Sequence, residues 1–168
     1  MTRGEPKQSI LRRYLEDAIA AEHNFATELS AMSGEGDNMA ARFLFAQHAE
    51  ETHSQHRRLK ARLEALGGSS SGLKTAMAHL FNLIPKAAQI GHDDSEIAAQ
   101  NLIIGYAAEN AEIAMYEALA SIAAAAGDMQ TERLAREIQE EERRAARMIW
   151  HLISPCAKES YGKISRAA

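Results

Sequence analysis

The chain has 168 residues, of which 46% are hydrophobic, 25% are charged and only 5% are aromatic, and its formal net charge is −4. This composition is typical of one helix-rich globular domain and gives no reason to expect a nucleic-acid partner. No apolar run reaches membrane-spanning length and the polar N-terminus lacks the apolar core of a signal peptide, so we expect a cytoplasmic protein without membrane association. The single cysteine, Cys156, excludes an internal disulfide and a thiolate metal centre.

Four stretches carry apolar residues at three- and four-residue spacing, the pattern of amphipathic helices. They predict helices over residues 9–32, 38–66, 94–126 and 129–154. Asp37 or Asn38 is expected to cap the second helix, and Gly127 with Asp128 to form the turn before the fourth. Pro155 is expected to end the fourth helix.

Two short turns and one long connection separate these helices. The connection covers residues 67–94, and a short helix is expected within it at residues 73–83. Two helical hairpins joined by a long connection predict an all-α, ferritin-like four-helix bundle in which a crossover makes the second and third helices parallel. The alternative is an up-and-down bundle with a loose middle loop. Residues 1–158 are expected to form this single domain, and residues 159–168 a mobile tail.

Two pairs of glutamates repeat one spacing. Glu22 and Glu51 are 29 residues apart, as are Glu112 and Glu141, and the second pair follows the first by 90 residues. Burying a carboxylate in a helical core is unfavourable unless it is paired or bound to a cation. Duplicated carboxylates on core faces therefore predict a metal site made by two helix pairs.

Helical phase selects the inward polar residues, because each residue advances about 100° around the helix axis. In the second helix the polar residues near the core direction are His48, Glu51, Thr52 and Gln55. Glu50 and His53 have the spacing of a bundle metal motif but lie mostly on the opposite face, and His56 is interpreted as surface with them. His48 is interpreted as a hydrogen-bonded core histidine, with a direct metal ligand as the alternative.

The other helices supply further inward carboxylates. Glu22 lies in the apolar stripe of the first helix, and Glu109 and Glu112 lie on the core side of the third. Glu141 and Glu142 flank the core stripe of the fourth; helical phase does not separate them, and the 90-residue repeat favours Glu141. Such a cluster would repel itself unless divalent cations neutralised it, and oxygen ligands favour iron or manganese.

Three segments carry a resemblance to a known family. "FAQHAEETHSQHRRL", "PKAAQIGHDD" and "AAENAEIAMYEAL" resemble the second helix, crossover and third helix of the YciE/YciF-like stress-protein family of ferritin-like proteins. The last segment also resembles the third helix of rubrerythrin-type di-iron proteins. The resemblance covers residues 11–153. The metal contacts that it implies come from Glu22, Glu51, Glu109, Glu112 and the Glu141–Glu142 pair.

The chain departs from the Glu-x-x-His motif that ferritin-like proteins carry on their second and fourth helices. Gln55 and Ala145 occupy the two inward histidine positions. Gln55 can still offer a carbonyl oxygen, whereas Ala145 offers no ligand, so the expected site is rich in oxygen and holds two metal ions or only one. Gln55, His48 and Tyr116 are candidates for an additional ligand or a supporting hydrogen bond.

These features lead to two hypotheses for function. The first is a non-haem di-metal carboxylate protein that binds iron or manganese and reacts with oxygen or peroxide in stress defence, as an oxidase- or peroxidase-like oxidoreductase. The second is a structural or interaction protein of the same fold whose metal site is purely structural, stabilising the bundle, or vestigial.

A homodimer is also expected, because the chain has more large apolar residues than one core stripe per helix requires. The residues concerned are Phe43, Phe45, Phe81, Leu83 and Trp150. A symmetric dimer contact would cover them. The alternative is that the crossover packs over its own bundle and over Trp150.

Overall fold

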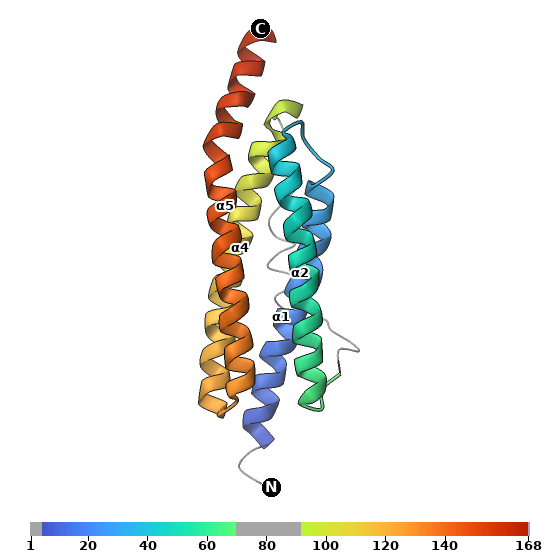
Figure 1. The fold of residues 1–168 in the computed structure, drawn as a ribbon, viewed down its shortest axis with the longest axis vertical. Coiled ribbons are helices and arrows are strands. Elements are labelled where there is room, and N and C mark those ends of the chain that lie inside the picture. Colours follow the sequence, from blue (N-terminus) through green and yellow to red (C-terminus); the bar gives the residue numbers. More distant parts are fainter. Residues whose placement is uncertain (1–4, 70–91, 168) are drawn as a thin grey trace.

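The computed structural model describes residues 5–69 and 92–167, and these ranges contain helices and turns but no strand. Four long helices lie side by side, and a short 3-10 turn, η2, leads into the third of them (Figure 1). The elements are α1 (Glu5–Met32), α2 (Met39–Ala65), η2 (Asp94–Glu96), α4 (Ile97–Ala126) and α5 (Met129–Ala167). Within the described ranges no helix combines the length and apolar character needed to cross a membrane.

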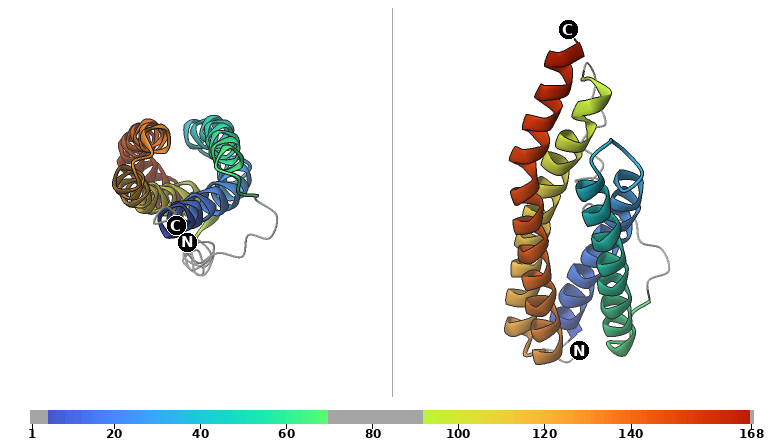
Figure 2. Two further views of the ribbon diagram at one scale, coloured as in Figure 1. Left: turned by 90° about the horizontal axis from the view of Figure 1, so that it is seen from below. Right: turned by 45° about the horizontal axis from the view of Figure 1, so that its top comes forward.

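The helices form two antiparallel hairpins, α1–α2 and α4–α5. α2 and α4 run in the same direction (Figure 1). Residue 69, which follows α2, and residue 92, which precedes α4, therefore lie toward opposite ends of the bundle (Figure 1). Seen along the bundle, α1 of the first hairpin lies next to α4 of the second, and α2 lies next to α5 (Figure 2). The predicted ferritin-like bundle with a crossover is confirmed, and the up-and-down alternative is wrong. The short helix predicted at residues 73–83 lies outside the described residues.

Local sequence explains several helix ends. The Asn38 side chain accepts a hydrogen bond from the Ala41 backbone N–H at 3.0 Å, so Asn38 is the cap of α2. Asp93 caps η2, and Glu96 completes a reciprocal capping box with it. Gly127 ends α4 with a φ of 78°, a left-handed conformation that glycine adopts without strain.

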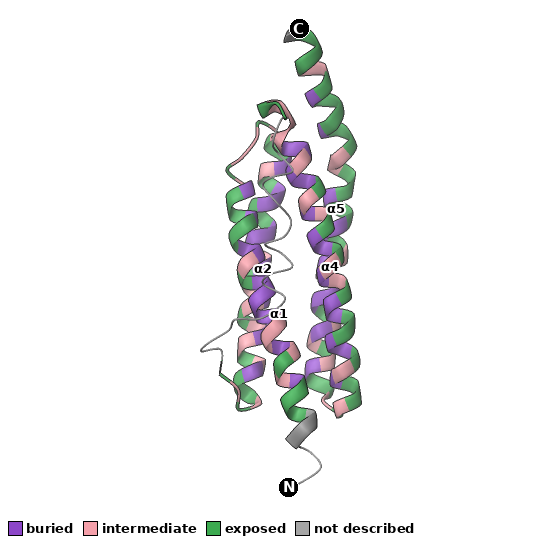
Figure 3. Ribbon diagram, turned by 180° about the vertical axis from the view of Figure 1, so that it is seen from behind, coloured by how far each residue is buried: buried purple, intermediate pink, exposed green. Residues whose placement is uncertain are grey.

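Each helix buries one stripe of side chains against the others (Figure 3). The stripe is apolar toward both ends of the bundle: Leu15 and Leu29 of α1 are fully buried, and so are Leu102 and Leu119 of α4. Buried polar residues lie between these apolar positions on all four helices. A polar layer, sealed above and below by apolar side chains, therefore lies midway along the bundle.

The predicted end of the fourth helix is wrong. α5 continues through Pro155 to Ala167, although an interior proline removes one backbone hydrogen bond and crowds the preceding turn. Contacts with distant residues hold the continuation in place. Cys156 is buried, and the Ser160 hydroxyl donates to the Ser95 carbonyl at 2.6 Å. Lys163 pairs with Asp37, in the turn between α1 and α2, at 2.8 Å. The residues expected to form a tail are thus helical as far as Ala167.

Candidate metal centre

The polar layer is built from side chains of all four helices. Its buried members are Glu22 of α1, His48, Thr52 and Gln55 of α2, Glu109 and Glu112 of α4, and Glu142 of α5. Each lies three or four residues from a buried apolar neighbour, except Glu109, which lies two turns from the buried Leu102 and Tyr116. The rotation that buries the apolar stripe therefore also buries the polar groups. The four glutamates have no exposed surface. Such groups need protons, partners or a cation to be stable there.

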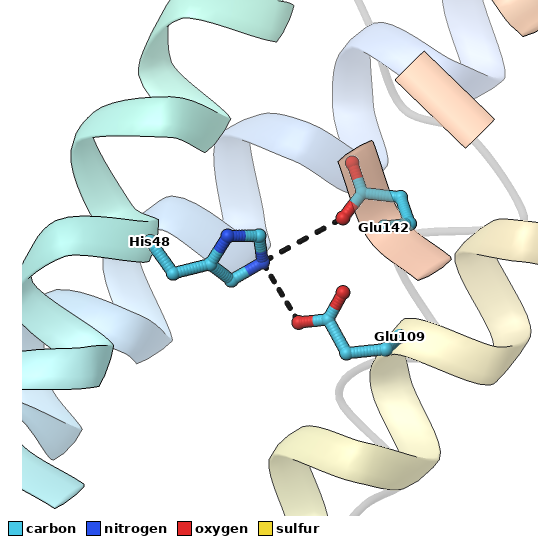
Figure 4. Close-up of side chains that lie close together, drawn as sticks. All are labelled: His48, Glu109 and Glu142. Atoms are coloured by element: carbon cyan, nitrogen blue, oxygen red, sulfur yellow. Dashed lines mark ion pairs between the residues drawn. The ribbon is translucent and has the colours of Figure 1, made fainter. Parts of the chain in front are cut away.

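A histidine and two glutamates converge at the centre of the layer (Figure 4). His48 Nε2 lies 2.8 Å from Glu109 Oε1 and 3.6 Å from Glu142 Oε2. The potential ligand atoms of these three residues all lie within 4.8 Å of one another. In the described part of the chain this is the one group of three or more such side chains close enough to share a metal ion.

Glu22 and Glu112 bring two more carboxylates into the layer. The Tyr116 hydroxyl donates a hydrogen bond to Glu22 Oε1, which leaves Glu22 Oε2 without a hydrogen-bond partner among the described residues. Neither carboxylate oxygen of Glu112 has such a partner in the described ranges. Leaving a buried hydrogen-bond acceptor unsatisfied is unfavourable. These oxygens are therefore candidates for donating electron pairs to a bound cation.

Burial raises the pKa values of the carboxyl groups in this layer. The pKa of Glu22 rises to about 8, chiefly because burial disfavours the charged form; the hydrogen bond from Tyr116 opposes this rise. Burial, and then the charge of neighbouring glutamates, raises the pKa values of Glu112 and Glu142 well above the usual range. Without a cation these groups therefore hold protons near neutral pH.

His48 responds in the opposite sense to its surroundings. Burial disfavours its charged form, but the charge of Glu109 and hydrogen bonding to Glu109 and Glu51 outweigh burial and raise the His48 pKa to about 10. Without metal, the imidazolium is thus the counter-ion of Glu109. Binding a cation through Nε2 requires the imidazole to lose this proton, so protons and a metal compete for the same groups.

Glu51 and Glu141 lie at the rim of the layer. The Glu51 side chain is 34% exposed and that of Glu141 is 17% exposed. Glu51 Oε2 is 3.5 Å from His48 Nδ1, and Glu141 pairs with Arg58. Gln55 Nε2 donates to Glu141 at 3.1 Å and also to the buried carboxylate of Glu142.

The structure separates Glu141 from Glu142, which helical phase left open. Glu142 is the buried member, so the repeat favoured the wrong residue for the inward position. Positions 90 residues apart nevertheless have the same degree of burial. Glu51 and Glu141 are both half-buried, while Thr52 and Glu142 are both buried. At the two inward histidine positions, Gln55 and Ala145 are buried as expected.

The remaining predicted positions are as follows. Glu50 and His53 are exposed, as helical phase predicted. His56 is half-buried, with its ring centroid 5.6 Å from that of His23. His48 is buried, as its place on an apolar face predicted, but its distance from Glu109 depends on the packing of α2 against α4, which the sequence does not give.

The donor set fits a first-row divalent cation. The layer offers one imidazole nitrogen and the oxygens of four buried carboxylates, a combination that favours iron or manganese over softer metals. Gln55 Oε1 is an additional buried oxygen without a hydrogen-bond partner in the described part of the chain.

The chain is similar in sequence and fold to known proteins. Residues 7–161 match the profile of the family described as "Domain of unknown function (DUF892)". A protein of Xanthomonas campestris pv. campestris is 24% identical with a TM-score of 0.79, and the match covers 95% of this chain and 99% of that one. The stress protein YciF of E. coli is 21% identical with a TM-score of 0.80, over 91% of this chain and 98% of that one.

The similarity extends to a protein with a diiron site. The bacterioferritin of Desulfovibrio desulfuricans is 18% identical with a TM-score of 0.67, and the match covers 100% of this chain and 92% of that one. At these identities the solved structures establish a shared fold. None of the curated proteins gives a significant match.

Proposed function

We propose that this chain, which belongs to the DUF892 family, binds iron or manganese in the polar layer of its bundle and exposes the metal to oxygen or peroxide. The resemblance to YciE/YciF-like ferritin-like proteins is confirmed. One observation carries the proposal. His48 Nε2 lies beside Glu109 and Glu142, in a layer where the oxygens of Glu112 have no hydrogen-bond partner among the described residues.

The side chains divide into two groups around this layer. His48, Glu109 and Glu142 would hold one cation, and Glu112 with Glu22 would share it or hold a second one. A bound redox-active ion would supply electrons to the oxidant. The apolar residues on both sides of the layer limit the access of water to these groups.

Tyr116 contacts Glu22 directly. Its hydroxyl donates to Glu22 Oε1, and burial first of all, followed by the charge of neighbouring glutamates, raises the pKa of the phenol well above its usual value. Tyr116 therefore keeps its proton and holds Glu22 in one orientation. This supports a positioning role for the phenol.

A second candidate function is structural. It is favoured by the loss of ligands from the Glu-x-x-His motif. On α2, Thr52 stands at the glutamate position and Gln55 at the histidine position, and on α5 Ala145 stands at the histidine position. With fewer donors, a metal bound here would stabilise the bundle without turnover. We place the protein in the cytoplasm in either case. A role in stress response rests only on the likeness to YciF, which is described as a stress protein.

Metal analysis followed by oxidation tests the proposal. Protein purified without added metal would be loaded anaerobically with Fe²⁺ or Mn²⁺, and its spectrum would be followed after oxygen or peroxide is added. We expect uptake of one or two ions and a spectral change with the oxidant. Uptake without a spectral change would favour the structural alternative. No uptake would refute metal binding in both functions and leave only a vestigial site. His48→Ala with Glu142→Gln should lose the metal, whereas the exposed change Glu50→Gln should keep it.

A further inference from the structure

Two half-buried carboxylates, Glu51 and Glu141, lie where α2 meets α5, outside the fully buried layer. Glu51 approaches the exposed Arg144 of α5, with Oε1 and Nη2 3.7 Å apart. Glu141 of α5 pairs with Arg58 of α2. Glu51 and Glu141 therefore occupy neighbouring turns of the same junction between the two helices, each beside an arginine.

Each rim carboxylate is linked to the interior through one buried side chain. Glu51 Oε2 is 3.5 Å from His48 Nδ1, and the other nitrogen of the same ring is 2.8 Å from Glu109. Gln55 Nε2 donates to both Glu141 and Glu142. His48 is 2% exposed and Gln55 is fully buried. Gln55 Oε1 has no hydrogen-bond partner among the described residues, so the residue that contacts both Glu141 and Glu142 also carries a carbonyl oxygen available to a cation.

The junction between α2 and α5 is bridged by polar contacts along its length. Toward the α4–α5 turn, Arg62 donates to Thr131, Gln130 and Asp128. Polar side chains can exchange a protein partner for water or a hydrated cation at little cost in free energy, whereas an apolar junction would have to expose hydrocarbon. A cation would therefore meet less resistance at this junction than at an apolar one.

We propose that Glu51 and Glu141 form an outer loading site for a hydrated divalent cation, Fe²⁺ or Mn²⁺, and pass it to His48, Glu109 and Glu142. This inference rests on the proposed function. The buried glutamates have no surface exposed to solvent, so a cation must exchange its water ligands stepwise on its way in. The rim carboxylates supply the first protein oxygens, and the cation displaces Arg144 and Arg58 as their counter-ions.

Uptake kinetics test this proposal. Anaerobic stopped-flow mixing with Co²⁺, whose visible absorption changes on ligation, gives the rate of uptake, and metal analysis after dialysis gives the number of ions retained. Glu51→Gln combined with Glu141→Gln should lower the association rate constant by at least about tenfold, because carboxylates raise the local cation concentration. The number of ions retained should equal that of the parent protein. The single variant Glu51→Gln should give a smaller decrease.

The matched control is Glu50→Gln combined with Glu140→Gln. These exposed neighbours have the same charges on the same two helices, so the variant has the same net charge but keeps the rim carboxylates. We expect its association rate constant to stay within about twofold of the parent value. Arg144→Gln should raise the rate, because a competing counter-ion is removed.

The outcomes distinguish this inference from the function on which it rests. If the rim variant takes up Co²⁺ at the parental rate, the loading site is refuted while metal binding stands. If it retains fewer ions than the parent, Glu51 and Glu141 are permanent ligands and the inference is again wrong. If the parent itself takes up no Co²⁺, Fe²⁺ or Mn²⁺, the proposed function fails, and the loading site with it.

Discussion

His48 organises the centre of this bundle because its two ring nitrogens face different carboxylates. Nδ1 faces the rim at Glu51, and Nε2 faces the interior at Glu109 and Glu142. In the metal-free protein the ring is charged and compensates part of the acidic layer, since its pKa is raised to about 10. A cation held by Nε2 takes over this role. In the proposed function, the same residue would therefore stabilise the layer without metal and serve as a ligand when a cation is bound.

We predict that the metal-free protein loses stability as pH rises from about 5 to 8. Glu22 has a pKa of about 8 in the folded protein against 4.5 ordinarily, so between these values the folded state holds a proton that the unfolded state has released. Raising the pH then favours unfolding. His48 acts in the same direction between 6.5 and about 10.

Melting temperatures in the presence of a chelator measure this effect. Glu22→Gln should show a shallower decrease from pH 5 to 8 than the parent protein, because the amide does not titrate. The surface change Glu50→Gln should leave the parental slope intact. Equal slopes for the parent and Glu22→Gln would show that Glu22 does not retain its proton in the fold.

A second prediction at this scale concerns Glu112. Both of its oxygens lack hydrogen-bond partners in the described ranges, so a cation would be their main stabilising contact. Glu112→Gln should weaken Fe²⁺ or Mn²⁺ binding more than about tenfold, measured by anaerobic titration calorimetry. Glu50→Gln has the same chemistry on the exposed face and should bind like the parent. Similar dissociation constants for the two variants would remove Glu112 from the site.

α5 is the element whose extent is decided by contacts far along the chain. Pro155 should weaken the helix locally, yet the helix continues for twelve more residues to Ala167. Ser160 is 6% exposed, and its hydroxyl donates to the carbonyl of Ser95, just before α4. The last turns of α5 therefore hold the beginning of α4, which carries Glu109 and Glu112 further along.

We predict that Ser160→Ala lowers the free energy of unfolding by about 1 kcal/mol, the usual net contribution of an intramolecular hydrogen bond, because the partly buried bond to Ser95 is lost. Urea unfolding followed by circular dichroism would measure it. Ser154→Ala, at an exposed position of the same helix, should change the free energy by less than about 0.5 kcal/mol. An equal loss in both variants would mean that the contact with Ser95 is not stabilising.

At the scale of the whole molecule, two hairpins meet around the polar layer, and some large apolar side chains remain outside the core. Phe45 is buried, so it belongs to the core and not to a docking surface. Phe43 is 71% exposed and Trp150 is 59% exposed, with the Trp150 ring centroid 5.2 Å from that of Tyr106. Phe81 and Leu83 lie outside the described residues. The homodimer stays a prediction, and Phe43 and Trp150 are the exposed residues that such a contact would cover.

Light scattering at micromolar concentration should return twice the chain mass of 18.4 kDa. Trp150→Asp should shift the mass to that of one chain, because a charge would be buried in the contact. Glu140→Gln, an exposed change on the same helix, serves as the control and should remain dimeric. A parent protein at 18.4 kDa would refute the dimer. A dimer that survives Trp150→Asp would place the contact elsewhere.

Much of this fold and site is determined by local sequence. Helical spacing and turn residues are properties of short segments, so they predicted the four helices, a cap at Asp37 or Asn38, of which the structure has Asn38, and the turn at Gly127. The inward direction of Glu22, Glu109 and Glu112 also followed from the phase of a single helix, since each lies within an apolar stripe. The ferritin-like crossover followed from connection lengths.

Tertiary structure decided what depends on the rotation of one helix against another. Whether Glu141 or Glu142 enters the layer is set by the packing of α5 on α4 and α2, and the packing of α2 brings His48 to Glu109. Beyond Pro155, the last turns of α5 meet Ser95, which lies more than sixty residues from Ser160 in the sequence. Local sequence determines how a side chain points from its own helix. Only the packing of helices determines which partner it meets, because that distance depends on two surfaces together.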